Sequence, residues 1–290
     1  MQYIIMDLEW NTAYSNRCGR YINEIIEIGA VKLNENREII STFSSFVKPQ
    51  IEKKLHSRVK ILTNITNDDI RDSKDFLTVI DSFCDWIGDD RTIFLSWGNM
   101  DIRVLIDNFS YSKGISNIPF IDYYVDLQDY CMDMLKLPKS QQLGLNNAAD
   151  ALNINLDNFI LHRALTDSEI SAKCFNKLYN EDEFVSRISK CDKVYYERLL
   201  FKPFVINDIN DPLVDKSIMN CKCTECGQNA MRIDNWKFVN GSFRAFYFCK
   251  NCKIKIRVNI QFKKYYERVN VKKSVVKIQP KKQDQKTADA

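Results

Sequence analysis

The chain has 290 residues, more than one average domain, and with 45% hydrophobic and 28% charged residues its composition is that of a globular protein. It shows no cationic leader and no apolar run long enough to span a bilayer, so we expect a soluble, cytoplasmic protein rather than a membrane protein. The cytosol keeps thiols reduced, so the ten cysteines are expected to be free thiols or metal ligands instead of disulfides.

The net charge of +4 combines two unlike halves. Residues 191–290 contain 21 Lys and Arg against 10 Asp and Glu, a local charge of +11, whereas residues 1–190 contain 21 against 28, a local charge of −7. An acidic half suits carboxylates that bind cations, and a basic half suits a polyanion such as nucleic acid. The alternative is that the basic residues only keep the protein soluble.

The first half alternates between strand and helix patterns. In chain order the predicted elements are strands over 3–10, 25–33 and 43–49, a helix over 75–89, a buried strand over 92–97, a helix over 101–114, a strand over 123–130, a helix over 143–154 and a last helix that follows 162–167. Strands first, and then strands alternating with helices, indicate a layered α/β domain with a mixed sheet.

Four acidic residues of this half are unusual for their positions. Because side chains alternate along a strand, Asp7 and Glu9 project together from one face of an otherwise apolar strand. Asp101 lies where the strand over 92–97 gives way to a helix, and Asp167 lies on the apolar stripe of the last helix, which points it toward the core. A buried carboxylate is costly unless a cation or hydrogen-bond donors meet it.

Each of these residues also has a simpler interpretation. Asp101 and Asp167 could be acids of a helix's first turn, where free N–H groups and the helix dipole favour them. Asp7 and Glu9 could be surface acids at a strand end, and His162, five residues before Asp167, could be an ordinary loop histidine. Taken together, the simple interpretation requires four separate coincidences in one domain.

The segments "DLEWN", "SWGNMD" and "HRALTD", in this order and at these separations, resemble the DEDDh 3′-to-5′ exonucleases, whose fold is RNase H-like. The resemblance covers roughly residues 1–180 and includes "EIIEIGAVKL", "FSSFVKP" and "LTNIT", where the family often has Gly in place of Asn64. Within the family, the chain looks most similar to the exoribonuclease-like, sporulation-inhibitor (KapD-type) group.

The resemblance implies a two-metal hydrolase. Asp7, Glu9, Asp101 and Asp167 would be ligands of two Mg²⁺ or Mn²⁺ ions, hard cations that prefer oxygen, and His162 would be the general base. The substrate would be a single-stranded 3′ end, with RNA favoured over DNA. The alternatives are a DNA-trimming or proofreading-type exonuclease and a non-catalytic regulatory protein that binds nucleic acid. His56, in the polar "KKLHSR", is expected to be a surface residue.

The second half contains two cysteine pairs separated by 22 residues. This spacing is typical of the two knuckles of a structural Cys₄ zinc site, here Cys223, Cys226, Cys249 and Cys252. Asn240-Gly241 between the pairs is a strong hairpin signal, and the whole resembles a zinc ribbon. The alternative is a set of buried cysteines without metal, and Cys221 could compete with Cys223 for the first knuckle.

Residues 253–262 alternate strictly between polar and apolar side chains, so Lys253, Lys255 and Arg257 are predicted to share one face. This stripe could bind a phosphate backbone while nearby aromatic residues stack on unpaired bases. Those aromatic residues are Phe243, Phe246, Tyr247, Tyr265 and Tyr266. The alternatives are that they form the ribbon's own core, or that the ribbon binds a protein partner.

The expected fold is therefore α/β, an RNase H-like mixed sheet flanked by helices, with a small β-rich zinc ribbon. The expected organisation is an exonuclease domain over 1–185, a helical linker over 186–215, a zinc-ribbon module over 216–270 and a disordered basic tail over 271–290.

Overall fold

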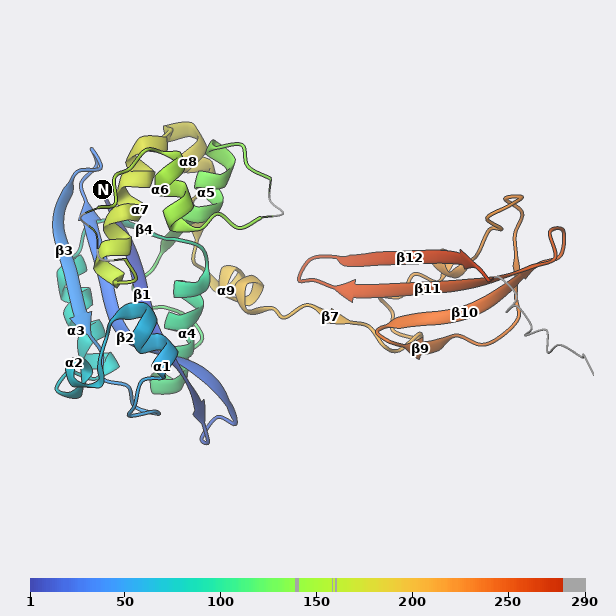
Figure 1. Ribbon diagram of the computed structural model, residues 1–290, viewed down its shortest axis with the longest axis horizontal. Helices are drawn as coiled ribbons and strands as arrows, with labels where there is room; N and C mark the ends of the chain where they lie inside the picture. The colour runs from blue at the N-terminus through green and yellow to red at the C-terminus, as the bar shows by residue number, and fades with distance from the viewer. Residues whose placement is uncertain (139–140, 158, 160, 279–290) are drawn as a thin grey trace, which may run out of the picture. The chain divides into compact units, whose positions relative to one another are not determined.

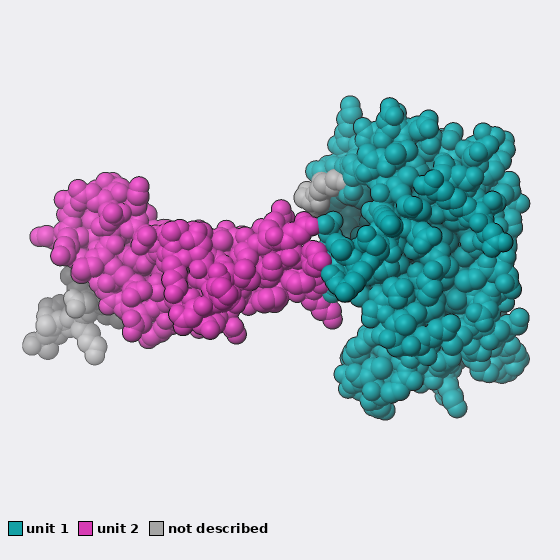
Figure 2. Space-filling view, turned by 180° about the vertical axis from the view of Figure 1, so that it is seen from behind, with its two compact units in different colours: residues 1–200 teal, residues 201–290 magenta. Residues whose placement is uncertain are grey.

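The computed structural model describes residues 1–138, 141–157, 159 and 161–278, and the chain divides into two compact units, unit 1 (1–200) and unit 2 (201–290) (Figure 2). Unit 1 therefore extends beyond the expected boundary at 185. The reason is tertiary packing: α8 (Glu181–Arg187) and α9 (Lys193–Leu200) bury Phe184, Tyr196 and Leu199 in the cores of unit 1, and β6 (Ser189–Lys190) pairs with its sheet.

Unit 1 is built on a six-stranded mixed sheet of order β3-β2-β1-β4-β5-β6. β1 pairs antiparallel with β2 and parallel with β4, so it is the strand at which the antiparallel meander meets the parallel strands. The other bounds are β1 (Gln2–Ser15), β2 (Arg20–Leu33), β3 (Ile39–Phe46), β4 (Thr92–Ser96) and β5 (Tyr123–Asp126). The predicted α/β class and mixed sheet are confirmed.

Helices cover both faces of this sheet (Figure 1). α3, α4 and α9 pack on the face that carries Ile4, Met6 and Leu8, whereas α5, α6, α7 and α8 pack on the face that carries Tyr3 and Ile5. The strand alternation read from the sequence thus holds. The helices are α1 (Ser57–Thr63), α2 (Asn67–Arg71), α3 (Phe76–Ile87), α4 (Met100–Lys113), α5 (Leu127–Met134), α6 (Leu145–Ala151) and α7 (Ala164–Leu178).

One predicted strand changes into a helix. The strand expected over 123–130 ends at Asp126, and residues from Leu127 onward begin α5. The side chain of Asp126 accepts a hydrogen bond from the backbone N–H of Asp129 and so caps the helix. The helix cap at this position ends the strand, although the residues that follow include enough aromatic and apolar side chains to resemble a strand.

Unit 2 is β-rich, with a principal sheet of order β12-β11-β10-β8. β7 pairs with β11, β9 pairs with β10, and a short 3₁₀ helix, η1, precedes the sheet strands. The bounds are β7 (Phe204–Val205), η1 (Lys216–Met219), β8 (Met231–Arg232), β9 (Lys237–Val239), β10 (Ser242–Cys249), β11 (Ile254–Lys264) and β12 (Val269–Lys277). The second half of the expected linker over 186–215 therefore belongs to unit 2.

The disordered tail expected from residue 271 is wrong for its first part, because 269–277 form β12. This strand pairs with β11 from Val269↔Lys264 to Lys277↔Ile256. Its side chains are mostly exposed, as an edge strand allows, so it is held by backbone hydrogen bonds and needs few core residues. Residues 279–290 of the expected tail lie outside the described residues.

Of the helices in the described part of the chain, none is both long and apolar enough to cross a membrane.

Candidate active site

The two acids of β1 lie on the strand at the centre of the unit 1 sheet. Asp7 pairs with Gly29 of β2, and Glu9 pairs with Glu27. The register of the two strands shifts between Glu9 and Trp10, so a bulge follows directly after the second acid. Both carboxylates leave the strand on the side that α7 covers, in agreement with the predicted alternation.

Asp101 reaches the same place from α4. It is the second residue of that helix and is 4% exposed. Its Oδ1 accepts a hydrogen bond of 3.1 Å from the backbone N–H of Leu8, the residue between the two acids of β1. Burial raises the pKa of Asp101 to about 7, although hydrogen bonds, first the one from Leu8, oppose the rise.

Asp167 and His162 come from the first turn of α7 and the segment before it. Helix α7 approaches β2 so closely that a Cβ atom at Gly29 would lie 2.0 Å from the backbone nitrogen of Leu165. Only glycine leaves room for this contact. His162 is exposed and has a φ of 60°, in the left-handed region that few residues other than glycine adopt.

A buried ion pair holds the segment before α7. Glu27 on β2 is 1% exposed, and its carboxylate accepts hydrogen bonds from Arg163 Nη2 at 2.6 Å and from the backbone N–H of Ala164 at 3.2 Å. Because Arg163 directly follows His162, the pair anchors the chain that carries the histidine. Neither residue is among those predicted from the sequence; the available signal was an acid inside the apolar strand over 25–33, since a buried acid needs a partner.

The structure brings the five predicted residues together. One carboxylate oxygen each from Asp7, Glu9 and Asp167 lies within 4.8 Å of the others. Asp101 and His162 are not part of that group, but they line the same cavity of about 650 Å³. A cavity of this size is typical of a site for a small molecule or for the end of a larger one.

The acid cluster is electrostatically unfavourable without a cation. Burial, and then the charges of Asp101 and Asp167, raise the pKa of Asp7 well above its usual value. Burial, followed by the charge of Asp167, raises the pKa of Glu9 to about 8. Burial raises the pKa of Asp167 to about 6, while nearby His162 acts to lower it. A bound divalent cation would relieve this repulsion, and an all-oxygen donor set fits Mg²⁺ or Mn²⁺.

The segment around α1 explains two further positions. His56 is exposed, as expected, and its Nε2 is hydrogen-bonded to the backbone oxygen of Thr12 at 2.8 Å. Asn64 ends α1 with a φ of 57°. Asparagine adopts the left-handed conformation more readily than most residues, which accounts for Asn at a position where the resembling family often has Gly.

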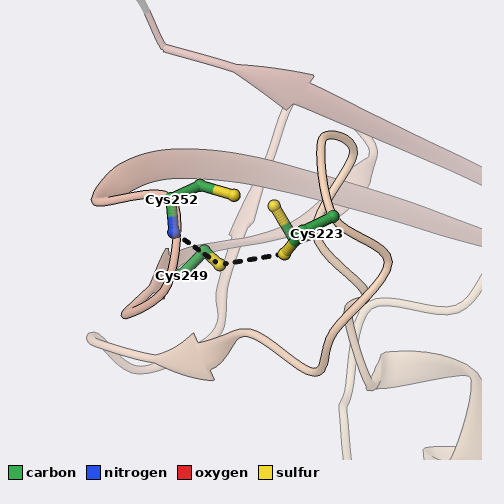
Figure 3. A group of neighbouring side chains, drawn as sticks. Cys223, Cys249 and Cys252 are labelled. Atoms are coloured by element: carbon green, nitrogen blue, oxygen red, sulfur yellow. Dashed lines mark hydrogen bonds between the residues drawn. The ribbon is translucent and has the colours of Figure 1, made fainter.

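The four cysteines predicted as metal ligands meet in unit 2. Their sulfur atoms all lie within 4.8 Å of one another, and Cys226 Sγ is 3.6 Å from Cys249 Sγ. Figure 3 shows Cys223 on one turn pointing toward Cys249 and Cys252 on the other. Four sulfurs each about 2.3 Å from one tetrahedral zinc ion would be about 3.8 Å apart, so the cluster fits such an ion.

Backbone groups support the sulfurs. The N–H of Glu225 donates to Cys223 Sγ, and the N–H of Cys252 donates to Cys249 Sγ. A backbone hydrogen bond from Gln228 lowers the pKa of Cys226 to about 6, whereas the hydrogen bond with Cys226 raises the pKa of Cys252 to about 12, so without a metal ion the two sulfurs share a proton. Cys221 and Cys223 are both buried in the unit 2 core, but the four-cysteine group contains Cys223 and not Cys221.

Two of the three basic residues of the predicted stripe lie on β11. Lys255 and Arg257 point away from the buried side chains Ile256 and Val258, as the alternation requires. Lys253 differs: it lies in the turn before the strand, with a φ of 53°. The turn is set by the second cysteine knuckle, so the regular alternation begins only at residue 254.

Comparison with known proteins agrees with the geometry of unit 1. A family described as "RNase_T: Exonuclease" matches residues 4–175. The chain is similar to the probable 3′-5′ exonuclease KapD of Bacillus subtilis, with 27% identity over 168 residues, which cover 58% of this chain and 78% of that protein. It is also similar to a PolC-type DNA polymerase III of Staphylococcus aureus, with 30% identity over 190 residues, 62% of this chain but only 11% of the polymerase.

A solved structure described as the nuclease domain of 3′hExo, a DEDDh family member bound to rAMP, resembles this chain with a TM-score of 0.54. The two are 23% identical, and the match covers 66% of this chain and 97% of that domain. This likeness confirms the predicted RNase H-like fold of the exonucleases.

Proposed function

Because the chain belongs to the RNase_T exonuclease family, we propose that it is a 3′-to-5′ exonuclease that removes nucleotides from single-stranded ends, with RNA favoured over DNA. The observation that carries the proposal is the cavity lined by Asp7, Glu9, Asp101, His162 and Asp167. These residues are far apart in the sequence, and titratable groups with shifted pKa values that meet in one cavity are typical of active sites.

Four carboxylates would hold two Mg²⁺ or Mn²⁺ ions: those of Asp7, Glu9, Asp101 and Asp167. Two such ions, when bound, stabilise the charge on the attacking and leaving oxygens of a phosphodiester and make a bound water more acidic. The protein itself fixes the positions of the carboxylates before any ion binds. The Leu8 N–H fixes Asp101, and the close contact of α7 with β2 fixes Asp167.

His162 would accept the proton of the attacking water. An imidazole ring is the side chain that most often serves as a general base in enzymes. An exposed imidazole can approach a substrate from the side of the solvent, while the Glu27–Arg163 ion pair keeps the neighbouring backbone in place.

The walls of the cavity suit an unpaired base. Trp10, Leu62 and Met100 line it beside the acids, and Leu62 and Met100 are 51% and 49% exposed. Apolar side chains beside the reaction centre can pack against the face of a base that has no pairing partner. The rAMP bound to the nuclease domain of similar fold favours RNA as the substrate.

A DNA-trimming or proofreading-type exonuclease is the second candidate, and the similarity to the PolC-type polymerase favours it. The alternative of a non-catalytic regulatory protein does not explain why acids are buried together, where burial and mutual repulsion raise the pKa values of Asp7 and Glu9.

We also propose that the four-cysteine cluster holds one structural zinc ion, bound by Cys223, Cys226, Cys249 and Cys252 as thiolates. The sulfur separations and the backbone donors to sulfur support this assignment.

The test of the activity uses single-stranded RNA and DNA of one sequence, labelled at the 5′ end, with Mg²⁺, with Mn²⁺ and after dialysis against metal-free buffer. We expect a metal-dependent ladder of products shortened from the 3′ end, with RNA degraded faster. Asp7→Asn should abolish the ladder, whereas Asp150→Asn, at an exposed acid of α6, should not. Faster degradation of DNA would favour the second candidate, and no shortening of either strand would refute the proposal.

A further inference from the structure

The principal sheet of unit 2 has one covered face and one open face. On the covered face, side chains such as Tyr247 and Val258 are buried, and Tyr247 Oη donates a hydrogen bond to the backbone oxygen of Met219. Alternate residues of the same strands point to the other side. The open face, as defined by the strand pairing, carries Phe246, Phe248 and six cations, Lys237, Arg244, Lys255, Arg257, Lys263 and Lys272.

This open face comes from four strands that are adjacent in the sheet, β9, β10, β11 and β12, of which the last three are seen side by side in Figure 1. Phe246 lies opposite Arg257, Phe248 opposite Lys255, and Lys237 opposite Arg244. The aromatic rings and cations are thus interleaved across the strands, a relation that no single stretch of sequence displays.

The strands that form the open face carry charge of one sign, and an acid beside them is Asp234, whose Oδ1 accepts a hydrogen bond of 2.6 Å from the backbone N–H of Phe246. Residues 235–266, which include β9, β10 and β11, contain no Asp or Glu, and β12 contains none either. Arg244 Nε donates to the neutral side chain of Asn259 at 2.9 Å. Among the described residues, the buried Nε of Arg257 has no hydrogen-bond acceptor. The concentration of positive charge favours a polyanionic partner.

The aromatic residues narrow the choice of polyanion. The ammonium group of Lys255 lies 4.6 Å from the centre of the Phe246 ring, so a cation adjoins an aromatic face. Phe246 and Phe248 are only partly buried, whereas Phe243 and Tyr247 of the same strand belong to the core. A single strand can contact cations with its phosphates and stack its free bases on such rings, but a duplex keeps its bases in its interior.

We propose that the open face of unit 2 binds single-stranded nucleic acid, with phosphates contacting Arg244, Lys255, Arg257 and Lys272 and a base stacking on Phe246. This inference rests on the proposed function only for the kind of substrate. This binding region is distinct from the acid cluster. It would be a second binding site for the strand whose 3′ end is cleaved.

The test measures binding of a fluorescent 20-nucleotide oligouridine by the full chain carrying Asp7→Asn, which is expected not to cleave it. Fluorescence anisotropy is recorded at several salt concentrations. Adding Lys255→Gln or Lys272→Gln should weaken binding and flatten the slope of log affinity against log salt by about 0.7 for each lost phosphate contact. Lys216→Gln, an equal charge change at an exposed lysine of η1, should leave the slope unchanged.

A second variant separates stacking from charge. Phe246→Ala should weaken binding by about 5- to 100-fold without changing the salt slope, and Phe246→Tyr should restore most of the affinity. Circular dichroism and zinc content verify that each variant is folded.

If neither the lysine variants nor Phe246→Ala differ from the Lys216→Gln control, the open face does not bind nucleic acid, and an acidic protein segment becomes the candidate partner. Equal affinity for single-stranded RNA and a duplex of the same length would also overturn the proposal. Binding is measured without cleavage, so the two proposals are tested separately. Failure of the exonuclease assay on the wild-type chain would refute the proposed activity, whereas the anisotropy measurements alone decide whether the open face binds single strands.

Discussion

Each acidic residue of the cavity lies in surroundings that disfavour its ionised form. Asp101 is 4% exposed, and burial raises the pKa of Asp7, Glu9, Asp101 and Asp167 above the usual carboxylate values. Folding therefore brings together charges that the metal-free protein must partly neutralise by protonation. We therefore expect the stability of the protein to depend on pH and, through the proposed cations, on Mg²⁺.

The first prediction concerns this pH dependence. Acids with raised pKa values in the folded state stabilise the metal-free protein at low pH, and that stabilisation is lost as the pH rises through the folded-state values, which are about 6 for Asp167, 7 for Asp101 and 8 for Glu9. The melting temperature without Mg²⁺ should fall between about pH 5 and pH 8, and Mg²⁺ should raise it more at pH 8 than at pH 6.

Differential scanning calorimetry at matched ionic strength provides the measurement. Asp7→Asn removes one of the repelling charges, so it should raise the metal-free melting temperature at pH 8 and largely remove the effect of Mg²⁺. Asp150→Asn on the exposed side of α6 is the control. A melting temperature that responds to Mg²⁺ equally at both pH values would show that these acids do not bind the ion.

The second prediction concerns His162. Replacing it by alanine should lower the turnover number by about 10²- to 10⁴-fold, the usual effect of losing a general base, and should change the pH profile of the rate. Mg²⁺ binding should persist because the carboxylates remain. His56→Ala is a matched control, since His56 is the other histidine of the chain and it is hydrogen-bonded to Thr12. An unchanged rate and pH profile would make His162 a structural residue.

At the scale of elements, the site depends on how closely α7 approaches β2. A Cβ at Gly29 would clash with the backbone of Ala164 and Leu165, and backbone cannot move aside as a flexible side chain can. We predict that Gly29→Ala destabilises unit 1 by about 1–3 kcal/mol, the usual cost of overpacking, and lowers activity because Asp167 moves with the helix. Urea unfolding and the cleavage assay measure the two effects.

Gly144→Ala is the control for stability alone, because the nearest atom to its added Cβ is 3.8 Å away and its φ of −65° suits any residue, but Gly144 lines the cavity of the acids. Equal free energies of unfolding for the two variants would mean that α7 can move away from β2 without a loss of stability.

The two turns that carry the cysteine pairs also have to meet in the folded protein. The sulfur atoms of both turns lie within 4.8 Å of one another, and thiolates this close repel unless a cation binds them, so we predict that binding of zinc and ordering of the two turns are coupled. The purified protein should contain about one zinc per chain, and Cys223→Ser should lose the metal and the protease resistance of unit 2. Cys18→Ser, at an exposed cysteine of unit 1, is the control. A folded, zinc-free wild-type chain would contradict the assignment.

At the scale of the whole molecule, each unit has its own core. The three hydrophobic clusters of unit 1 are formed entirely by residues 3–199, and the core of unit 2 by residues 206–275. We predict that residues 1–200 fold alone and cleave short single strands in the presence of Mg²⁺. The shortened chain should bind long strands more weakly than the full chain and with a flatter salt dependence, because it lacks the open face. Loss of cooperative unfolding in residues 1–200 would show that unit 1 needs unit 2.

The sequence alone determined the features that depend on local periodicity. Alternation along β1 is sufficient to assign Asp7 and Glu9 to one face, helical spacing assigns Asp167 to the core side of α7, and the spacing of the cysteine pairs singles out the four cysteines that meet in unit 2. These assignments need only neighbouring residues, because the geometry of a strand, a helix or a tight turn repeats over a few positions.

Only the tertiary structure decided the features that join distant segments. The ion pair between Glu27 and Arg163 spans 136 positions, and the need for glycine at position 29 arises from a helix that begins at Ala164. β12 is ordered by its partner strand rather than by its own composition, and the open face exists because pairing sets Phe246 beside Arg257. Such contacts follow from the packing of whole elements, which the periodicity of one segment does not contain.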